Sequence, residues 1–255
     1  MKRIKLVIAY DGTNYCGWQI QDNGVSVEAV LNHELSALLG ETVTVIGASR
    51  TDSGVHALGN VAVFDTETRI PPEKISYALN KRLPEDIRIQ SSEEVNADFH
   101  PRHCDSTKIY EYRILNRKFP VPTERLYSYF VYYPLDVEAM VEAARYLVGE
   151  HDFISFSSSH TQVLSTVRTI YELSVQKEGD MITIRVRGNG FLYNMVRLIA
   201  GTLIRVGLHI YPPEHVWEIL EDKKRGVAGP KSPARGLTLV GIEFSEENTH
   251  NQNDK

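Results

Sequence analysis

The chain has 255 residues, of which 42% are hydrophobic and 24% charged, and its formal net charge at pH 7 is −5. This ordinary composition excludes a collagenous or disordered chain, and the length suffices for two modest domains or one large one. No run of about 18 apolar residues occurs, so a membrane-spanning helix is not expected. Because its two cysteines, Cys16 and Cys104, make no disulfide framework, a cytoplasmic setting is expected.

The first half of the chain predicts the element order β-α-β-β-α-β. Residues 3–10 alternate apolar and polar side chains as a strand does. Residues 26–40 repeat apolar residues at helical spacing, with Ser26 as the N-cap and Gly40 just after the last turn. The further elements expected are strands over 42–48 and 60–66, a helix over 71–83 and a strand over 86–95.

The second half repeats this order. Residues 106–116 predict a strand in which Tyr110, Tyr112 and Ile114 share one face. The further elements expected are a helix over 136–150 with Asp136 as N-cap, a hairpin over 167–188, helices over 191–207 and 212–222, and a strand over 237–244.

Two halves of this kind predict an α+β protein made of two ferredoxin-like domains with antiparallel or mixed sheets. We expect the first domain at residues 1–104 and the second at 105–246, followed by a polar tail at 247–255. The repeat is one of topology, because the two halves show no clear similarity in sequence.

Basic residues are concentrated in two segments although the net charge is negative. Residues 181–205 carry four arginines and no acid, and residues 223–235 carry five basic residues and no acid. An acidic protein with such segments can bind a nucleic acid through one face. Solvated basic loops are the alternative interpretation.

The stretch GASRTDSGVHALGN, residues 47–60, places Asp52 between Arg50 and His56. Asp-Ser-Gly favours a turn, so one interpretation is purely structural. The other is a carboxylate held ionised beside an arginine, which can attack an anomeric carbon or an electron-poor ring. His56 is a candidate general base, although a structural role is commoner for such a histidine.

Other stretches yield no cofactor site. The histidines and cysteine of HPRHC, residues 100–104, have a metal-like spacing, but no second pair follows, so no metal site is expected. The Gly-Pro-Lys-Ser run at 229–232 lacks the context of a phosphate loop. Tyr110 and Tyr112 lie beside basic residues, which suits stacking on unpaired bases, although tyrosine also favours strands in general.

Five segments, in this order, resemble the tRNA pseudouridine synthase A family. They are YDGTNYCGWQIQ at 10–21, RTDSGVHA at 50–57, KIYEYRI at 108–114, GNGFLYNMVRLIAGTL at 188–203 and ARGLTLVGIEF at 234–244. They span nearly the whole chain. Two positions depart from the family's pattern, since Ser49 stands where glycine is usual and Ser53 where alanine is common.

The resemblance implies a role for five residues. Asp52 falls on the catalytic nucleophile, and Arg197 on the basic residue that pairs with it. Arg50 falls on the arginine that helps to extrude the target uridine. Tyr110 matches the tyrosine that packs on the uracil ring, and Leu237 matches an apolar residue that lines the pocket.

The implied activity is the isomerisation of uridine to pseudouridine at positions 38, 39 and 40 of the tRNA anticodon stem-loop. The resemblance also implies the pseudouridine synthase fold, an active-site cleft between the two domains, base flipping, and a cytoplasmic homodimer. The reaction gains no atoms and changes no oxidation state, so it needs no cofactor or metal.

Two other functions stay open at this point. A noncatalytic RNA-binding protein with two RRM-like domains has the same order of elements, but the chain contains no RNP1 octamer. A hydrolase with a covalent carboxylate needs a partner acid, and none stands at a predictable spacing from Asp52.

Overall fold

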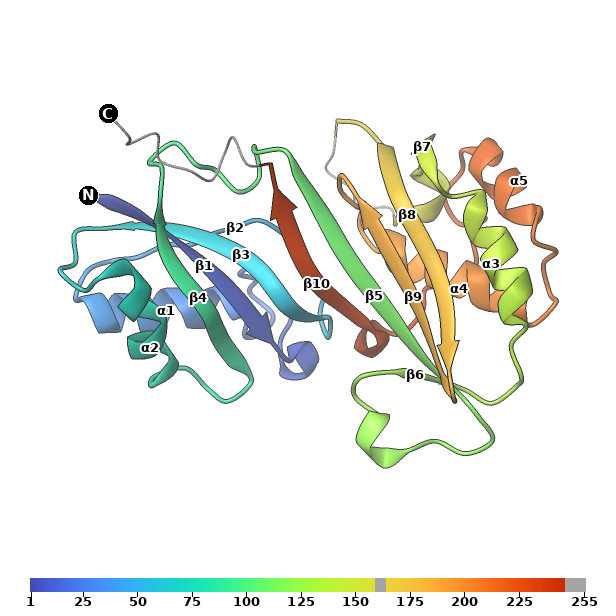
Figure 1. Ribbon diagram of the computed structural model, residues 1–255, viewed down its shortest axis with the longest axis horizontal. Helices are drawn as coiled ribbons and strands as arrows, with labels where there is room; N and C mark the ends of the chain where they lie inside the picture. Colours follow the sequence, from blue (N-terminus) through green and yellow to red (C-terminus); the bar gives the residue numbers. More distant parts are fainter. Residues whose placement is uncertain (159–163, 246–255) are drawn as a thin grey trace. The chain divides into compact units, whose positions relative to one another are not determined.

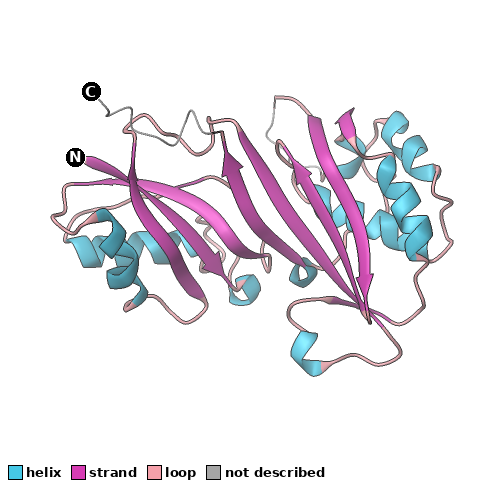
Figure 2. Cartoon of the chain, viewed as in Figure 1, coloured by secondary structure: helices cyan, strands magenta, loops and turns pink. Residues whose placement is uncertain are grey.

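The computed structural model describes residues 1–158 and 164–245, which confirm the predicted α+β class (Figure 1). They form two compact units: unit 1 consists of Met1–Ser106 and the residues from Leu239 on, and unit 2 of Thr107–Thr238. Strands and helices both occur in each unit (Figure 2). The domains expected at 1–104 and 105–246 place the last strand in the second domain. In the structure, this strand belongs to unit 1 from Leu239 on.

Unit 1 contains an antiparallel sheet in which β1 lies between β3 and β4. Both β2 and β10 neighbour β3, so the first four strands have the order β4-β1-β3-β2 of a ferredoxin-like unit. Helix α2 packs against α1 and β4 (Figure 1). The elements are β1 (Lys2–Tyr10), η1 (Gly12–Asn14), α1 (Val27–Leu39), β2 (Ile46–Gly47), β3 (His56–Thr66), α2 (Pro72–Asn80), β4 (Ile87–Val95) and, from Leu239 on, β10 (Leu237–Phe244).

Helix α1 begins and ends as its sequence predicts. The Ser26 Oγ atom accepts a hydrogen bond from the Ala29 N–H at 3.2 Å, and Gly40 has a φ of 71°, which favours glycine. Leu31 and Leu35 are fully buried on the face that packs into the core. The helix is therefore fixed by its caps and by its apolar stripe.

The strand expected over 42–48 is wrong in extent, because β2 covers only Ile46–Gly47. The backbone N–H groups before it donate to side chains of α1 instead of to a neighbouring strand. The Val43 N–H donates to Ser36 Oγ and the Val45 N–H to Asn32 Oδ1, both at 2.9 Å. Side chains of α1, 7 and 13 residues earlier in the chain, thus take the place of a neighbouring strand.

Unit 2 contains an antiparallel sheet in the order β5-β9-β8-β7, with β6 parallel to β5. Helix α3 packs against α4 and β8, and also contacts α5. The elements are β5 (Ser106–Asn116), η2 (Pro122–Glu124), β6 (Tyr129–Val131), α3 (Val137–Arg145), β7 (Gly149–Asp152), η3 (Ile154–Phe156), β8 (Val167–Glu178), β9 (Met181–Gly188), α4 (Met195–Gly207), α5 (His215–Asp222) and η4 (Ala234–Gly236).

Most elements of unit 2 follow the sequence prediction, including the hairpin and the Asp136 N-cap, whose Oδ1 accepts from the Ala139 N–H at 3.0 Å. Helix α4 starts at Met195 and not at residue 191, because Asn194 has a φ of 63°, outside the helical region. The helix expected over 136–150 is too long, because α3 ends at Arg145 and β7 begins at Gly149. Strand β6 was not expected either.

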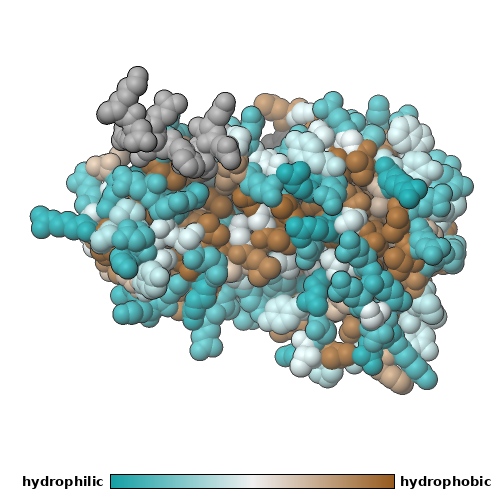
Figure 3. Space-filling model, in the orientation of Figure 1, coloured by the Kyte–Doolittle hydropathy of each residue, from teal (hydrophilic) through white to brown (hydrophobic). Residues whose placement is uncertain are grey.

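The core of each unit is apolar. On β5, Tyr112 and Ile114 are fully buried and Tyr110 is nearly so, which confirms that these three share the buried face. On the face drawn in Figure 3, hydrophobic side chains remain visible between hydrophilic ones. Among the described residues, no helix is long and apolar enough to cross a membrane.

Candidate active site

Asp52 lies in the loop of residues 48–55 that joins β2 to β3. Backbone hydrogen bonds attach this loop to the segment after β1: the Trp18 N–H donates to Thr51 O at 3.1 Å, and the Gly54 N–H to Tyr15 O at 3.3 Å. The Val55 N–H donates to Asp52 O at 3.1 Å, so the residues after Asp52 do form a turn. The Asp52 side chain is half-buried on this fixed backbone.

A buried network of hydrogen bonds holds this loop against β1 and β3. The fully buried Asn60 donates through Nδ2 to Ser49 O at 3.0 Å and to the Tyr10 hydroxyl at 3.3 Å. The Tyr10 and Thr51 hydroxyls are 2.7 Å apart. Both neighbours of Arg50 are therefore buried and bonded, while Arg50 itself is exposed.

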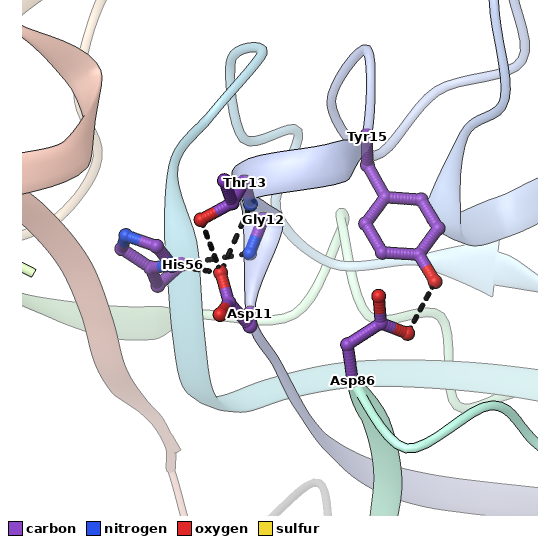
Figure 4. A network of polar contacts seen from close by, with 6 residues as sticks. All are labelled: Asp11, Gly12, Thr13, Tyr15, His56 and Asp86. Atoms are coloured by element: carbon purple, nitrogen blue, oxygen red, sulfur yellow. Dashed lines mark hydrogen bonds and ion pairs between the residues drawn. The ribbon is translucent and has the colours of Figure 1, made fainter. Parts of the chain in front are cut away.

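His56 lies in a second network, at the start of β3 (Figure 4). Its ring is 5% exposed, and its Nδ1 atom lies 3.1 Å from the backbone N–H of Gly12 and 3.1 Å from Asp11 Oδ1. The same Asp11 oxygen accepts from the Thr13 N–H at 3.0 Å and from its hydroxyl at 2.6 Å. These contacts support the structural interpretation of His56 over that of a general base.

Tyr15 extends the polar contacts of this region toward β4 (Figure 4). Its hydroxyl donates to Asp86 Oδ1 at 2.6 Å. Burial, and then the hydrogen bond to the Asp86 carboxylate, raise the pKa of the Tyr15 hydroxyl. The phenol therefore stays protonated and continues to donate this bond over the physiological pH range.

The other three expected residues belong to unit 2. Tyr110 lies on β5 and is 6% exposed, and its ring meets that of Phe191 edge to face at 5.4 Å. Arg197 lies on α4, where its Nε atom donates to Ser232 O at 2.8 Å and its Nη1 atom to Asn194 Oδ1 at 2.9 Å. Leu237, the first residue of β10, is buried.

Arg197 and the buried Tyr112 are brought near each other by the segment that contains Ser232 and Pro233. The Tyr112 hydroxyl donates to Pro233 O at 2.8 Å, next to the carbonyl that Arg197 binds. Burial is the largest influence on the Tyr112 hydroxyl and raises its pKa, while the Arg197 charge acts in the opposite direction. The spacing of residues along the sequence does not predict this contact of Tyr112 with the segment that binds Arg197.

The structure describes no cluster of three His, Cys, Asp or Glu side chains that could hold a metal ion. The rings of His100 and His103 meet at 4.1 Å, and burial and the nearby His103 lower the pKa of His100. Between them in sequence, Arg102 binds the backbone of β2, donating through Nε to Gly47 O at 2.7 Å.

A cavity of about 410 Å³ lies in unit 2, lined in part by Glu124, Arg125 and Arg235. Arg235 donates through Nε to Ser128 O at 3.3 Å at its edge. None of the five expected site residues lines this cavity.

Comparisons with known proteins agree over almost the full chain. A family model described as tRNA pseudouridine synthase matches residues 6–103 and 143–245. The tRNA pseudouridine synthase A of Thermoanaerobacter sp. (strain X514) is 49% identical over 244 residues, covering 96% of this chain and 100% of that protein. The same coverage is found for the proteins of that name from Ruminiclostridium cellulolyticum, 50% identical over 245 residues, and Acetivibrio thermocellus, 46% identical over 244.

Proposed function

The chain belongs to the tRNA pseudouridine synthase family, and from this membership we propose that it isomerises uridine to pseudouridine at positions 38, 39 and 40 of the tRNA anticodon stem-loop. The observation that carries the proposal is the 49% identity, over 96% of the chain, to a protein named tRNA pseudouridine synthase A. Arg50, Asp52, Arg197 and Leu237 fall inside the matched ranges, and Tyr110 lies between them.

Membership of an isomerase family decides between the functions that the sequence left open. A noncatalytic RNA-binding protein and a carboxylate hydrolase both lose their support, because neither explains a match over both halves of the chain to a synthase family. The enzyme is therefore an isomerase, and what stays to be tested is its target position and the roles of its residues.

In the proposed reaction the C1′–N1 bond of uridine breaks, the base turns, and C5 bonds to C1′. The proton that leaves C5 is balanced by one taken up at N1, so neither oxidant nor reductant is needed. We assign the nucleophile to Asp52, whether it attacks C1′ or C6 or first takes a ribose proton. All three routes need an ionised carboxylate, which an aspartate with a pKa of about 3.9 supplies at pH 7.

The geometry of unit 1 supports this assignment to Asp52. Its loop is bonded to the backbone of the segment after β1 on both sides, at Thr51 and at Gly54. A carboxylate on a fixed backbone loses little further freedom when the substrate binds. Arg50 is exposed two residues earlier, which suits a side chain that helps to extrude the target uridine.

In unit 2 we assign Arg197 as the cation that keeps Asp52 ionised and Tyr110 as the ring on which the uracil packs. Arg197 is oriented by two neutral acceptors, which fix its guanidinium without removing its charge. The edge-to-face contact with Phe191 sets the plane of the Tyr110 ring. Flipping the base costs a few kcal/mol, which stacking on Tyr110 would partly offset.

The test is tritium release from tRNA transcripts labelled at C5 of uridine, because mass cannot detect an isomerisation. Transcripts with a single uridine at 38, 39 or 40 are compared with one that carries it elsewhere in the stem-loop. We expect release from the three target transcripts by the wild type and none by Asp52→Asn, whose tRNA affinity stays close to wild type because phosphate contacts dominate binding. Asp180→Asn, at the exposed turn of the β8–β9 hairpin, is the matched control.

Release by Asp52→Asn at the wild-type rate would remove Asp52 from the chemistry. Equal loss of binding and turnover would show that the substitution damages the fold of the loop instead. Tritium release from the off-target transcript alone would show that the target uridine is not at position 38, 39 or 40.

We further propose that the enzyme is a cytoplasmic homodimer that binds tRNA through the basic segments 181–205 and 223–235. In the first segment, the Arg187 guanidinium lies 5.7 Å from the ring of Tyr171, a pairing that suits phosphate and base together. Charge reversal at Lys223, Lys224 and Arg225 should lower both the tRNA affinity and its dependence on salt. If both stay at the wild-type values, residues 223–235 do not contact tRNA. Sedimentation of the free protein tests the dimer.

A further inference from the structure

Arg102 is held in place although no motif marks it. It lies in the turn after β4, in which the backbone N–H groups of His103 and Cys104 donate to His100 O at 3.0 and 3.1 Å. The Arg102 Nε atom donates to the carbonyl of Gly47, the last residue of β2, at 2.7 Å. The guanidinium thus lies on the strand that leads directly into the Asp52 loop.

The acceptor of this bond is itself fixed. A Cβ atom at Gly47 would overlap the indole ring of Trp18, which is fully buried, so the backbone of β2 packs directly on that ring. The bond uses only the Nε–H of Arg102. Within the described ranges, the two terminal amino groups of its guanidinium have no hydrogen-bond or ion-pair partner.

A second cation, Arg50, acts on the charge of this group. Arg50, three residues beyond Gly47, is exposed and has no acid at ion-pair distance in the described part of the chain. After burial, the Arg50 charge is the largest influence that lowers the pKa of Arg102, and the more weakly coupled Glu28 carboxylate raises it. Repulsion between two like charges is unfavourable in the free protein, and an anion bound to both removes it.

We propose that Arg102, together with Arg50, binds a backbone phosphate of tRNA beside the target uridine. The inference rests on the proposed function, since it takes the substrate to be tRNA and the adjoining loop to carry the nucleophile. The planar fork of arginine, with its terminal N–H groups available, matches a phosphate in two-point contact. Because Asp52 follows Gly47 by five residues on one loop, a phosphate held here belongs to the nucleotides next to the one that reacts.

The test measures tRNA affinity against salt concentration for the wild type, Arg102→Gln, Arg102→Lys and the control Arg82→Gln. Arg82 is an exposed arginine of the same unit that is already paired with Glu34. We expect Arg102→Gln to weaken binding roughly tenfold and to reduce the slope of log K against log salt by about 1. Arg102→Lys should keep most of the slope, and Arg82→Gln all of it.

Saturating tRNA separates a phosphate contact from a structural role. We expect Arg102→Gln to keep the wild-type kcat for tritium release with a raised KM. A wild-type salt slope in Arg102→Gln, or a lost kcat with unchanged affinity, would overturn the proposal. Saturable binding of inorganic phosphate at constant ionic strength, lost in Arg102→Gln while tRNA affinity is kept, would reassign the site to a free anion and also overturn it.

Failure of the proposed function gives a different result. If the wild type releases no tritium from any tRNA, the synthase assignment fails, whereas the salt slopes still report whether Arg102 contacts RNA. A double substitution with Arg50→Gln adds a further check: binding losses that are less than additive indicate one shared phosphate, and strictly additive losses contradict it.

Discussion

The Nδ1 atom of His56 lies 3.1 Å from Asp11 Oδ1, and the two residues come from neighbouring ends of antiparallel strands. Asp11 directly follows β1, and His56 is the first residue of β3. Tyr10 is paired with Ala57 at the end of the β1–β3 ladder. The contact between His56 and Asp11 therefore lies directly beyond this last pair, where the Asp52 loop enters β3. The pair thus connects the sheet of unit 1 to the loop with the candidate nucleophile.

Replacing His56 by alanine should lower the free energy of unfolding by about 2 to 3 kcal/mol. The substitution leaves a cavity in a buried position and removes the acceptor of the Gly12 N–H. Urea denaturation measures the effect. The control His33→Ala, whose side chain is 79% exposed, should change stability by less than about 0.5 kcal/mol; equal values for the two variants would exclude a structural role for His56.

Gly47→Ala should destabilise the protein by about 1 to 3 kcal/mol, because the added methyl group overlaps the buried Trp18 ring. It should also raise the KM for tRNA, since the carbonyl that positions Arg102 has to move. Gly241→Ala is the matched control, because nothing lies within 4 Å of a Cβ atom there. A stable Gly47→Ala variant would show that the indole can shift away.

Stability should depend on pH through Asp65 at acid pH. The hydrogen bond from Arg3 is the main cause that holds the pKa of Asp65 below its ordinary value of 3.8. The carboxylate therefore stabilises the folded state above about pH 4, and this contribution, within about 1 kcal/mol for a partly exposed pair, disappears as the pH falls through the folded pKa. The difference in unfolding free energy between wild type and Asp65→Asn should shrink from pH 6 to pH 2; a constant difference contradicts the prediction.

Arg197→Gln should lower kcat/KM and shift the acid limb of its pH profile to higher pH. Loss of the proposed cation disfavours the ionised form of Asp52, because a nearby positive charge stabilises a carboxylate. Tritium release between pH 4 and 8 measures the shift, and Arg197→Lys should restore part of it. Arg205→Gln, in the last turn of the same helix, should leave the limb in place. An unshifted limb in Arg197→Gln would separate this residue from the ionisation of Asp52.

Local sequence rules predicted the elements that local chemistry decides. Ser26 and Gly40 bound α1 as expected, and β5 and β10 have the predicted ends. The strand over 42–48 was predicted too long because two of its N–H groups donate to the side chains of Ser36 and Asn32. The β propensity of a residue carries no information about such contacts with another element.

The candidate site shows the same division. Asp52 could be singled out from its neighbours and from the family resemblance, because the residues concerned lie in one short run. Arg102 could not, since its partner Gly47 is 55 positions away and is an unremarkable glycine until the Trp18 ring is seen beneath it. Motifs report chemistry that is contiguous in sequence, whereas the proposed anion site is built from residues that only folding brings together.

Because the last strand belongs to the N-terminal unit, the sheet of that unit is completed late in synthesis. From Leu239 on, β10 belongs to unit 1 and lies beside β3, and Phe244 meets the ring of Phe99 at 5.2 Å. The ribosome therefore delivers the final strand of the N-terminal unit after all of unit 2. Until then the edge of β3 that takes β10 is paired only with the two residues of β2, so most of this sheet edge stays open in the nascent N-terminal half. An open edge of this kind is a site for premature association and for chaperone binding.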